Sequence, residues 1–199
     1  MTKFIFDLDG TVTSEETLPL ISKHFGIKQK IDELTKETIA GNIPFIESFI
    51  RRVHILGKLP VSEIACLLEQ TKRYSLIADF IQKNKKSCAI ATGNLDCWVN
   101  KLVKRIDCDA FYSEAIVEKN QVVKIAKILK KESVVKNFQE QGYKVVFIGD
   151  GNNDMEAMRV ADTAIAIGIT HYPSKSLLPI CDYLIFNEKT LCRQLNQLF

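Results

Sequence analysis

Residues 3–13 of the chain, KFIFDLDGTVT, set the pattern around which the rest of the sequence is arranged. The run up to Phe6 is short and apolar and stops at two aspartates, which predicts a buried strand with acidic side chains at its carboxyl end. Residues two apart on an extended backbone point to the same side, so Asp7 and Asp9 are expected to converge. Two such carboxylates repel each other unless a cation lies between them, which favours a Mg²⁺ site over the alternative of a turn with two solvated acids.

The composition is that of an ordinary globular protein, with 199 residues of which 46% are hydrophobic. The 27 basic and 24 acidic residues give a net charge of +3, and neither sign is segregated along the chain. We therefore expect no nucleic-acid partner and no membrane partner. The six cysteines form no CxxC pair, and the sequence shows neither a secretory leader nor an apolar run of the ~20 residues that span a bilayer. A reduced, cytoplasmic protein is the expectation.

The apolar periodicity divides the chain into a helical segment and an alternating segment. Residues 15–75 are expected to be helical, with helices over 17–25, 29–40, 44–56 and 61–71. Beyond them, strands near 88–94, 110–112, 144–149, 164–168 and 183–186 alternate with helices near 77–84, 97–106, 131–141 and 155–160, and a hairpin turns at 118–121. This order predicts an α/β fold, a doubly wound and mostly parallel sheet, with a small helical cap inserted after the first strand. The predicted domains are a core of residues 1–14 and 76–199 and a cap of residues 15–75.

Polar residues follow several of the predicted strands. Since the carboxyl ends of parallel strands lie at one edge of a sheet, we expect these residues to meet there. They are Asp7, Asp9, Thr92, Gly93, Asp150 and Asp154, with Lys130 or Lys131 at the start of the helix before the last two. Carboxylates, a hydroxyl, a lysine and glycine-exposed amides suit the joint binding of Mg²⁺ and a phosphate. Asn153 lies in the same stretch, although the cap of the following helix is an alternative role for it.

The sequences DLDGTVT, ATG, a lysine and GDGNND, in that order, resemble the four motifs of the haloacid dehalogenase superfamily phosphatases. The helical insertion between the first two motifs is similar to the cap of the phosphoserine phosphatase branch. The resemblance implies that Asp7 is the nucleophile and Asp9 the general acid and base. It implies that Thr92 and Gly93 bind phosphate, that a lysine neutralises it, and that Asp154 supports the metal site. The implied Mg²⁺ ligands are Asp7, the backbone carbonyl of Asp9, and Asp150.

The motif lysine is the least certain of these residues. In the resembled family it opens a helix in a Lys-x-x-apolar-apolar pattern, which Lys131 fits with Val134 and Val135. Lys130 and Lys127 remain alternatives, since a single lysine is most often a solvated surface charge.

Two residues of the helical segment suggest the substrate. Glu16 and Arg52 fall where the phosphoserine phosphatase branch places the acid and the base that bind serine. An acid for an ammonium group and an arginine for a carboxylate are complementary to an amino acid. Ile39 and Phe45 are expected to supply apolar walls. The alternatives are a favourable charge near a helix start for Glu16 and a surface position for Arg52.

The resemblance implies a Mg²⁺-dependent phosphomonoester hydrolase that acts through an aspartyl-phosphate on a small phosphorylated metabolite, with O-phosphoserine as the expected substrate and Asn153 among the residues that bind it. One residue departs from this pattern and affects the choice of substrate. Asn94 occupies a position where the phosphoserine enzymes have glycine. The alternatives are another small phosphate ester, phosphoryl transfer to an alcohol, or a non-catalytic phosphate-binding module. No chemistry is predicted for His24, His54 or His171.

Overall fold

A computed structural model describes residues 1–39 and 42–199 of the chain, and it leaves the side chains of Ile39 and Phe45 undescribed. The strands form one seven-stranded sheet in the order β4-β3-β2-β1-β5-β6-β7. All neighbouring strands are parallel except the β3–β4 pair, which is antiparallel. Their bounds are β1 Thr2–Phe6, β2 Cys88–Leu95, β3 Asp109–Glu118, β4 Gln121–Lys127, β5 Lys144–Gly149, β6 Thr163–Ile167 and β7 Tyr183–Ile185. The predicted α/β class and mostly parallel sheet are confirmed.

Helices α1 to α8 lie close to the predicted ranges, whereas α9 was not predicted. They are α1 Thr17–His24, α2 Lys28–Ile39, α3 Phe45–Leu56, α4 Val61–Glu69, α5 Ser75–Lys83, α6 Asp96–Lys104, α7 Lys131–Glu140, α8 Met155–Val160 and α9 Glu188–Gln197, with short 3₁₀ turns η1 Lys85–Ser87 and η2 Asn152–Asp154. The predicted end of the second helix at residues 40–41 falls outside the described residues. Among the helices that the structure describes, none is long and apolar enough to cross a membrane.

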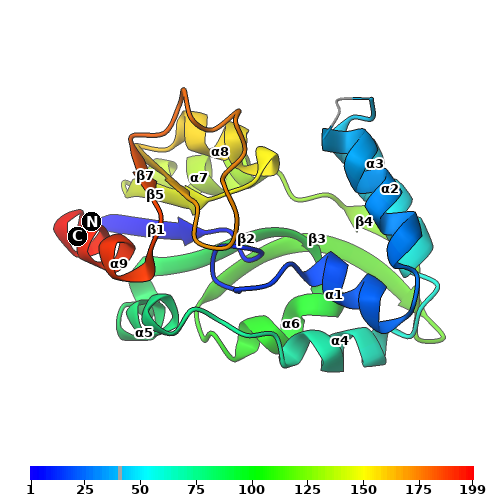
Figure 1. Cartoon of the computed structure of the whole chain (residues 1–199). Helices are drawn as coiled ribbons and strands as arrows, with labels where there is room; N and C mark the ends of the chain where they lie inside the picture. The colour runs from blue at the N-terminus through cyan, green and yellow to red at the C-terminus, as the bar shows by residue number, and fades with distance from the viewer. Residues whose placement is uncertain (40–41) are drawn as a thin grey trace.

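The central strand β1 explains the layering of the core. Phe4, Ile5 and Phe6 are fully buried, and their side chains alternate between the two faces of the sheet. Phe4 and Phe6 belong to the hydrophobic cluster that includes residues of α5, α6 and α9, whereas Ile5 packs in the cluster of α7 and α8. Figure 1 shows α7 and α8 on one face of the sheet and α5 and α6 on the other. Because both faces are covered, only the edges where the strands end remain open for a ligand.

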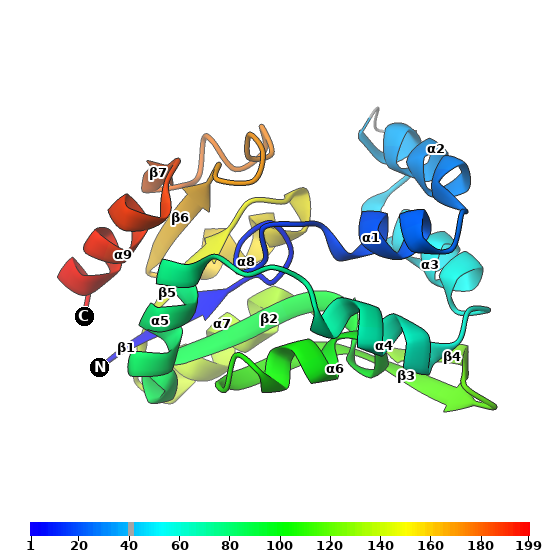
Figure 2. The same cartoon turned by 60° about the horizontal axis from the view of Figure 1, so that its bottom comes forward.

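The helices α1–α4 lie between β1 and α5 in the chain, as predicted. Helix α4 packs beside α6 of the core layer, while α2 and α3 pack against each other farther out, as Figure 2 shows. The hairpin of β3 and β4 is longer than predicted and reaches these helices. The amide of Val122 donates to the carbonyl of Gly57 at 2.9 Å, and that of Val61 donates to Asn120 at 2.8 Å. The helical segment therefore contacts the sheet through the hairpin as well as through its two connections, and its division from the core at residues 14 and 76 stays a prediction.

Candidate active site

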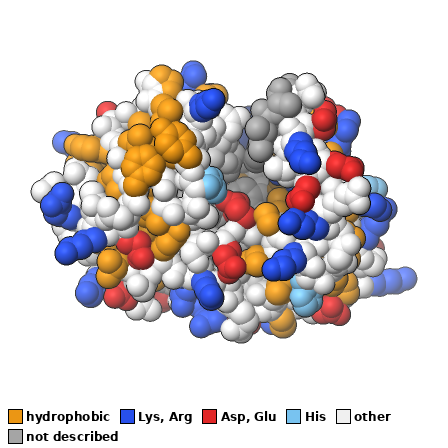
Figure 3. Space-filling view, in the orientation of Figure 1, with side chains coloured by type: hydrophobic (Ala, Val, Ile, Leu, Met, Phe, Trp, Pro, Cys, Tyr) orange, Lys and Arg blue, Asp and Glu red, His pale blue; other side chains and the backbone are white. Residues whose placement is uncertain are grey.

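The carboxyl ends of β1, β2 and β5 meet at one edge of the sheet. Strand β1 lies between the other two, with Phe6 paired to Ile90 on one side and to Ile148 on the other. A hollow of about 170 Å³ opens at this edge, and Figure 3 shows acidic side chains beside it. Its lining includes Asp7, Asp9, Glu16, Leu18, Phe49, Arg52, Thr92, Gly93, Asn94, Asp150, Gly151, Asn153 and His171. The structure thus brings together residues that are as far as 164 positions apart in the sequence.

Two of the lining residues, Asp7 and Asp150, form an acidic base together with Asp154, which does not itself line the hollow. Asp7, Asp150 and Asp154 are buried, and each offers a carboxylate oxygen within 4.8 Å of those of the other two. Burial raises the pKa of Asp7 well above its usual value, and the charge of Asp154 raises it further. Burial likewise raises the pKa of Asp150. A small divalent cation would offset this repulsion, and the all-oxygen donor set fits Mg²⁺.

The ammonium group of Lys131 lies between two of these acids. Its Nζ lies 2.6 Å from Oδ1 of Asp7 and 2.6 Å from Oδ1 of Asp154, and its side chain is buried. Burial alone would lower the pKa of Lys131, but the two carboxylates raise it, so the ammonium stays charged. Of the alternatives, Lys127 instead lies 3.7 Å from Glu114 on the surface. Among the three candidate lysines, the geometry favours Lys131.

Backbone amides and a hydroxyl fix two of the acids. The amides of Asp150 and Gly151 donate to Oδ2 of Asp154 at 3.1 and 2.9 Å. Thr11 donates its hydroxyl to Oδ1 of Asp150 at 2.9 Å and is fully buried. No role was predicted for Thr11 from the sequence, although it lies in the DLDGT stretch, two residues after Asp9.

Asp9 lies beside the acidic base, under the start of α1. Its Oδ1 accepts a hydrogen bond from the amide of Thr17 at 2.8 Å, and its Oδ2 accepts one from the side-chain amide of Asn94. Burial and the nearby charge of Glu16 raise the pKa of Asp9 to about 7, against the opposing effect of Thr17. A carboxyl group with a pKa near neutrality is suited to giving and taking a proton.

The end of β2 forms an open wall of the hollow. Thr92 is fully buried, and its Oγ1 accepts a hydrogen bond from the amide of Asn94 at 3.2 Å, which leaves the hydroxyl proton available. A Cβ added at Gly93 would meet no atom within 4 Å, so the backbone there is accessible to a ligand. Asn153 lines the hollow, and Asp154 rather than Asn153 occupies the N-cap position of α8. These groups are available to bind an anion.

The helical segment closes the other side of the hollow with Glu16 and Arg52. Arg52 donates through Nη2 to Oγ1 of Thr38 at 3.4 Å. Its Nε is buried and has no hydrogen-bond partner in the part of the chain that the structure describes. A buried guanidinium nitrogen of this kind is costly unless a ligand accepts from it. The predicted apolar walls, Ile39 and Phe45, lie outside the described side chains.

His171 is an ionisable residue of the hollow for which the sequence predicted no chemistry. Its Nε2 lies 2.9 Å from Oδ2 of Asp150 and 3.1 Å from Oε1 of Glu16, while Nδ1 lies 3.0 Å from the carbonyl oxygen of Tyr172. These contacts with Asp150 and Glu16 raise the pKa of His171 to about 11, so both ring nitrogens carry protons. The available signal was its position four residues after the end of β6, at the same edge of the sheet.

Gly10 is needed where the chain turns out of β1. Its φ is +68°, and a Cβ there would lie 2.7 Å from Oδ2 of Asp150 and 2.9 Å from Oε1 of Glu16. We expect Gly10→Ala to lower the free energy of unfolding by about 2 kcal/mol, and the rate of the reaction at this site by at least about tenfold, because of backbone strain and the displacement of the two acids. Urea denaturation and rate measurements check both values.

Gly26 offers a matched control for this substitution, since its φ is also +68° and a Cβ there meets nothing within 4 Å. Gly26→Ala should cost about 1 kcal/mol and leave the rate unchanged. Equal rate losses in the two variants would contradict a specific role for the space beside Gly10.

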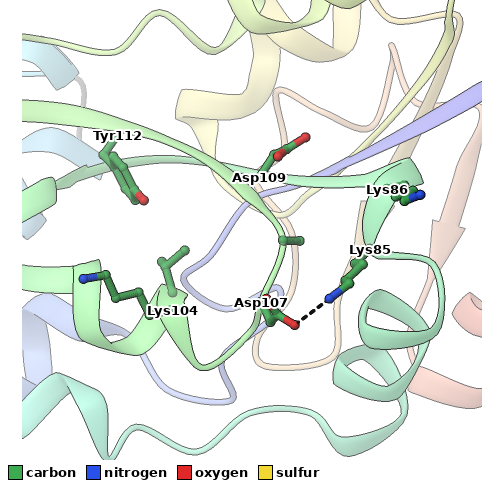
Figure 4. A pocket seen from close by; sticks show the side chains of 8 residues that line it. Lys85, Lys86, Lys104, Asp107, Asp109 and Tyr112 are labelled. Atoms are coloured by element: carbon green, nitrogen blue, oxygen red, sulfur yellow. Dashed lines mark hydrogen bonds and ion pairs between the residues drawn. The ribbon is translucent and has the colours of Figure 1, made fainter.

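A larger hollow, of about 550 Å³, lies at the opposite edge of the sheet, where β2 and β3 begin (Figure 4). Lys85, Lys86, Lys104, Asp107 and Tyr112 are among the residues that line it. Lys85 and Asp107 already form an ion pair there, at 3.1 Å. The acidic cluster and the open end of β2 belong to the smaller hollow, so the groups suited to catalysis gather at the carboxyl edge.

Residues 2–162 match the family model of the haloacid dehalogenase-like hydrolases. The chain belongs to this family. This hydrolase is 26% identical over 181 residues to a phosphoserine phosphatase of Methanocaldococcus jannaschii, a match that covers 81% of the chain and 83% of the relative. It is 27% identical to a phosphoserine phosphatase of Saccharomyces cerevisiae over 82% of the chain, which spans only 58% of that relative.

Solved structures show the same fold. A substrate-bound phosphoserine phosphatase complex superposes on the hydrolase with a TM-score of 0.80 at 21% identity, over 100% of this chain and 99% of the other. A phospho-aspartyl intermediate analogue of phosphoserine phosphatase gives the same TM-score and identity over 98% and 99% of the two chains. The predicted family and the prediction of an enzyme are confirmed.

Proposed function

We propose that this hydrolase is a Mg²⁺-dependent phosphomonoesterase that transfers the phosphoryl group of its substrate to Asp7. The observation that carries the proposal is the cluster of the Asp7, Asp150 and Asp154 carboxylates beside the open end of β2, with the charged Lys131 in contact with Asp7 and Asp154. Carboxylates, a buried ammonium and accessible backbone together suit a phosphate dianion bound next to a metal ion.

Mg²⁺ would be held by the carboxylates of Asp7 and Asp150 and by the backbone carbonyl of Asp9, with Asp154 in support. When bound, it supplies positive charge that lets an anionic nucleophile approach an anionic phosphate. Lys131 adds a second positive charge on the side of Asp7. Thr92 and the amide at Gly93 would donate hydrogen bonds to phosphate oxygens.

The reaction proceeds in two displacements. A carboxylate oxygen of Asp7 attacks phosphorus, the bond from phosphorus to the ester oxygen breaks, and Asp9 gives its proton to the departing alkoxide. Asp9 then removes a proton from a water molecule, which attacks the phosphorus of the aspartyl-phosphate. The bond between phosphorus and the Asp7 oxygen breaks, inorganic phosphate leaves, and the Asp7 carboxylate is regenerated. The pKa of Asp9, raised to about 7 by burial, suits both halves of this cycle.

The proposed substrate is O-phosphoserine or a closely similar phosphorylated amino acid. Arg52, which lines the hollow, would donate to the carboxylate, and Glu16 would accept from the ammonium group. The small volume of the hollow, about 170 Å³, and the names of the relatives from Methanocaldococcus jannaschii and Saccharomyces cerevisiae support a small phosphate ester.

A phosphate-release screen tests the function directly. The substrates are O-phosphoserine, O-phosphothreonine and sugar phosphates. Each is assayed in the presence of Mg²⁺ and again with a chelator, and homoserine is added in a separate set as a phosphoryl acceptor. We expect release from O-phosphoserine that is at least about tenfold faster than from the sugar phosphates and that stops with the chelator. Mg²⁺ and substrate binding without turnover would favour a binding module instead, and transfer to homoserine would favour a phosphotransferase.

Arg52→Met is expected to raise KM for O-phosphoserine by about 10- to 100-fold while kcat changes little, because a charge-assisted hydrogen bond to the substrate carboxylate is lost. Initial rates over a range of substrate concentrations give both constants. The neighbouring Arg51 is the control, since it is exposed and bonds Glu47 on its own helix at 2.5 Å. If Arg51→Met raised KM equally, the carboxylate-binding role of Arg52 would be wrong.

A further inference from the structure

Asn94 is a buried polar residue of the hollow that the proposed reaction does not use. It lies next to last in β2, its side chain is only 5% exposed, and it occupies the position where the resembled phosphoserine phosphatase pattern has glycine. A buried amide is kept only where its donors find acceptors.

Both donors of the Asn94 amide are engaged beside the proposed proton donor. Nδ2 donates to Oδ2 of Asp9 and to Oγ1 of Thr17, the latter at 2.9 Å. Thr17 in turn donates its backbone amide to Oδ1 of Asp9 at 2.8 Å. Each oxygen of the Asp9 carboxyl group is therefore held by one hydrogen bond, and its rotation is restricted from both sides.

We propose that Asn94 is a positioning residue that holds the Asp9 carboxyl group in the orientation that protonates the leaving oxygen; this inference rests on the proposed function. The NH₂ group of Asn94 can only donate a hydrogen bond, so it occupies one lone pair of Asp9 Oδ2. It cannot accept the carboxyl proton of Asp9 at that position. The carboxyl proton is left in a direction not occupied by Asn94 or Thr17. Asp9 itself lines the hollow, where the ester would bind.

The step that depends on this orientation is the first displacement. As the bond between Asp7 and phosphorus forms, the bond from phosphorus to the ester oxygen breaks, its electron pair stays on that oxygen, and the Asp9 proton is transferred to it. An alkyl alkoxide is a poor leaving group and needs the proton, whereas nitrophenolate leaves readily without one. A misplaced Asp9 should therefore slow alkyl esters far more than nitrophenyl esters.

The test compares the rate constant of the first displacement for O-phosphoserine, or the alkyl ester hydrolysed fastest, with that for p-nitrophenyl phosphate. It is measured in single turnovers with enzyme in excess and followed by release of the alcohol or the nitrophenol, because the second displacement is common to both esters. Asn94→Leu keeps the side-chain bulk and removes the donors, and we expect it to lower this rate constant for the alkyl ester by about 100-fold but for the aryl ester by less than about fivefold. Asn94→Gly should lose less, because water can enter and donate. Asn100→Leu on the exposed face of α6 is the matched control and should change neither rate.

Asp9→Asn is measured alongside, so that failure of the role of Asn94 can be distinguished from failure of the role of Asp9. Equal losses on both esters in Asn94→Leu, with Asp9→Asn strongly dependent on the leaving group, would overturn the role of Asn94 alone. Equal losses on both esters in Asp9→Asn would overturn the proposed role of Asp9. A rise in the enzyme concentration needed for half-saturation, without a change in the rate constant of the first displacement, would show that Asn94 binds substrate instead. If Asn94→Leu fails to fold, the same ratio of rate constants measured in Asn94→Gly decides.

Discussion

Replacing Asp7 by asparagine is expected to lower kcat for phosphate-ester hydrolysis by at least about four orders of magnitude, since removal of a covalent nucleophile costs up to about 10⁶-fold. The carboxamide matches the carboxylate in shape but has neither its nucleophilic oxygen nor its negative charge. Lys131 keeps its contact with Asp154 at 2.6 Å, so the fold should persist. Phosphate release measures the rate, and thermal unfolding followed by circular dichroism checks the fold.

Asp79→Asn is the control for the chemical change, because Asp79 is exposed on α5. It should retain the full rate. An Asp7→Asn variant that is folded and keeps more than about a hundredth of the activity would exclude a covalent role for Asp7.

Replacing Lys131 by methionine is expected to lower kcat by about 10³-fold and the free energy of unfolding by about 3 kcal/mol. The loss follows because two buried carboxylates, those of Asp7 and Asp154, would be left without the cation between them. Urea denaturation gives the stability and phosphate release gives the rate. Millimolar Mg²⁺ should restore part of the stability, since an ion that binds only the folded state shifts the equilibrium toward it.

Lys130→Met is the matched control, one residue away and at the N-cap of α7 rather than inside it. We expect it to change stability by less than about 0.5 kcal/mol and the rate by less than about threefold. Equal losses of rate and stability in the two variants would mean that the assignment of the motif lysine to Lys131, in place of Lys130, is wrong.

The burial of Lys131 could have been predicted from helical periodicity alone. Val134 and Val135, three and four residues on, are buried, and Lys131 shares their face of α7. The acids after β1 and β5 were predictable for a similar reason, because a parallel sheet brings its strand ends to one edge whatever the loops do. Local patterns therefore predicted most of the base of the hollow.

Contacts between distant residues could not be predicted in this way. The contact between Asn94 and Asp9 joins residues 85 positions apart, and the one between His171 and Glu16 joins residues 155 apart. From the sequence, Asn94 was related only to the choice of substrate, and the structure shows that its amide bonds Asp9. His171 lies in a connection without periodicity, so no local pattern distinguished it from the other histidines.

The last helix was not predicted, although its signals are local. Helix α9 buries Leu191 and Leu195, which are four residues apart, and Asn187 caps it by accepting from the amide of Thr190 at 2.8 Å. Both signals are present in the sequence, so this helix could have been predicted from a cap and one apolar face.

The central claim is that a phosphoryl group passes through Asp7, and acid quenching during turnover tests it most directly. The enzyme is mixed with Mg²⁺ and excess O-phosphoserine, or with the ester that the screen finds to react fastest. It is then quenched in acid and digested, and its peptides are analysed by mass spectrometry. We expect a peptide phosphorylated at residue 7, and we expect it to be absent with a chelator and in Asp7→Asn. Rapid turnover with no phosphorylated enzyme at any quench time, or with the phosphoryl group on another residue, would contradict this claim.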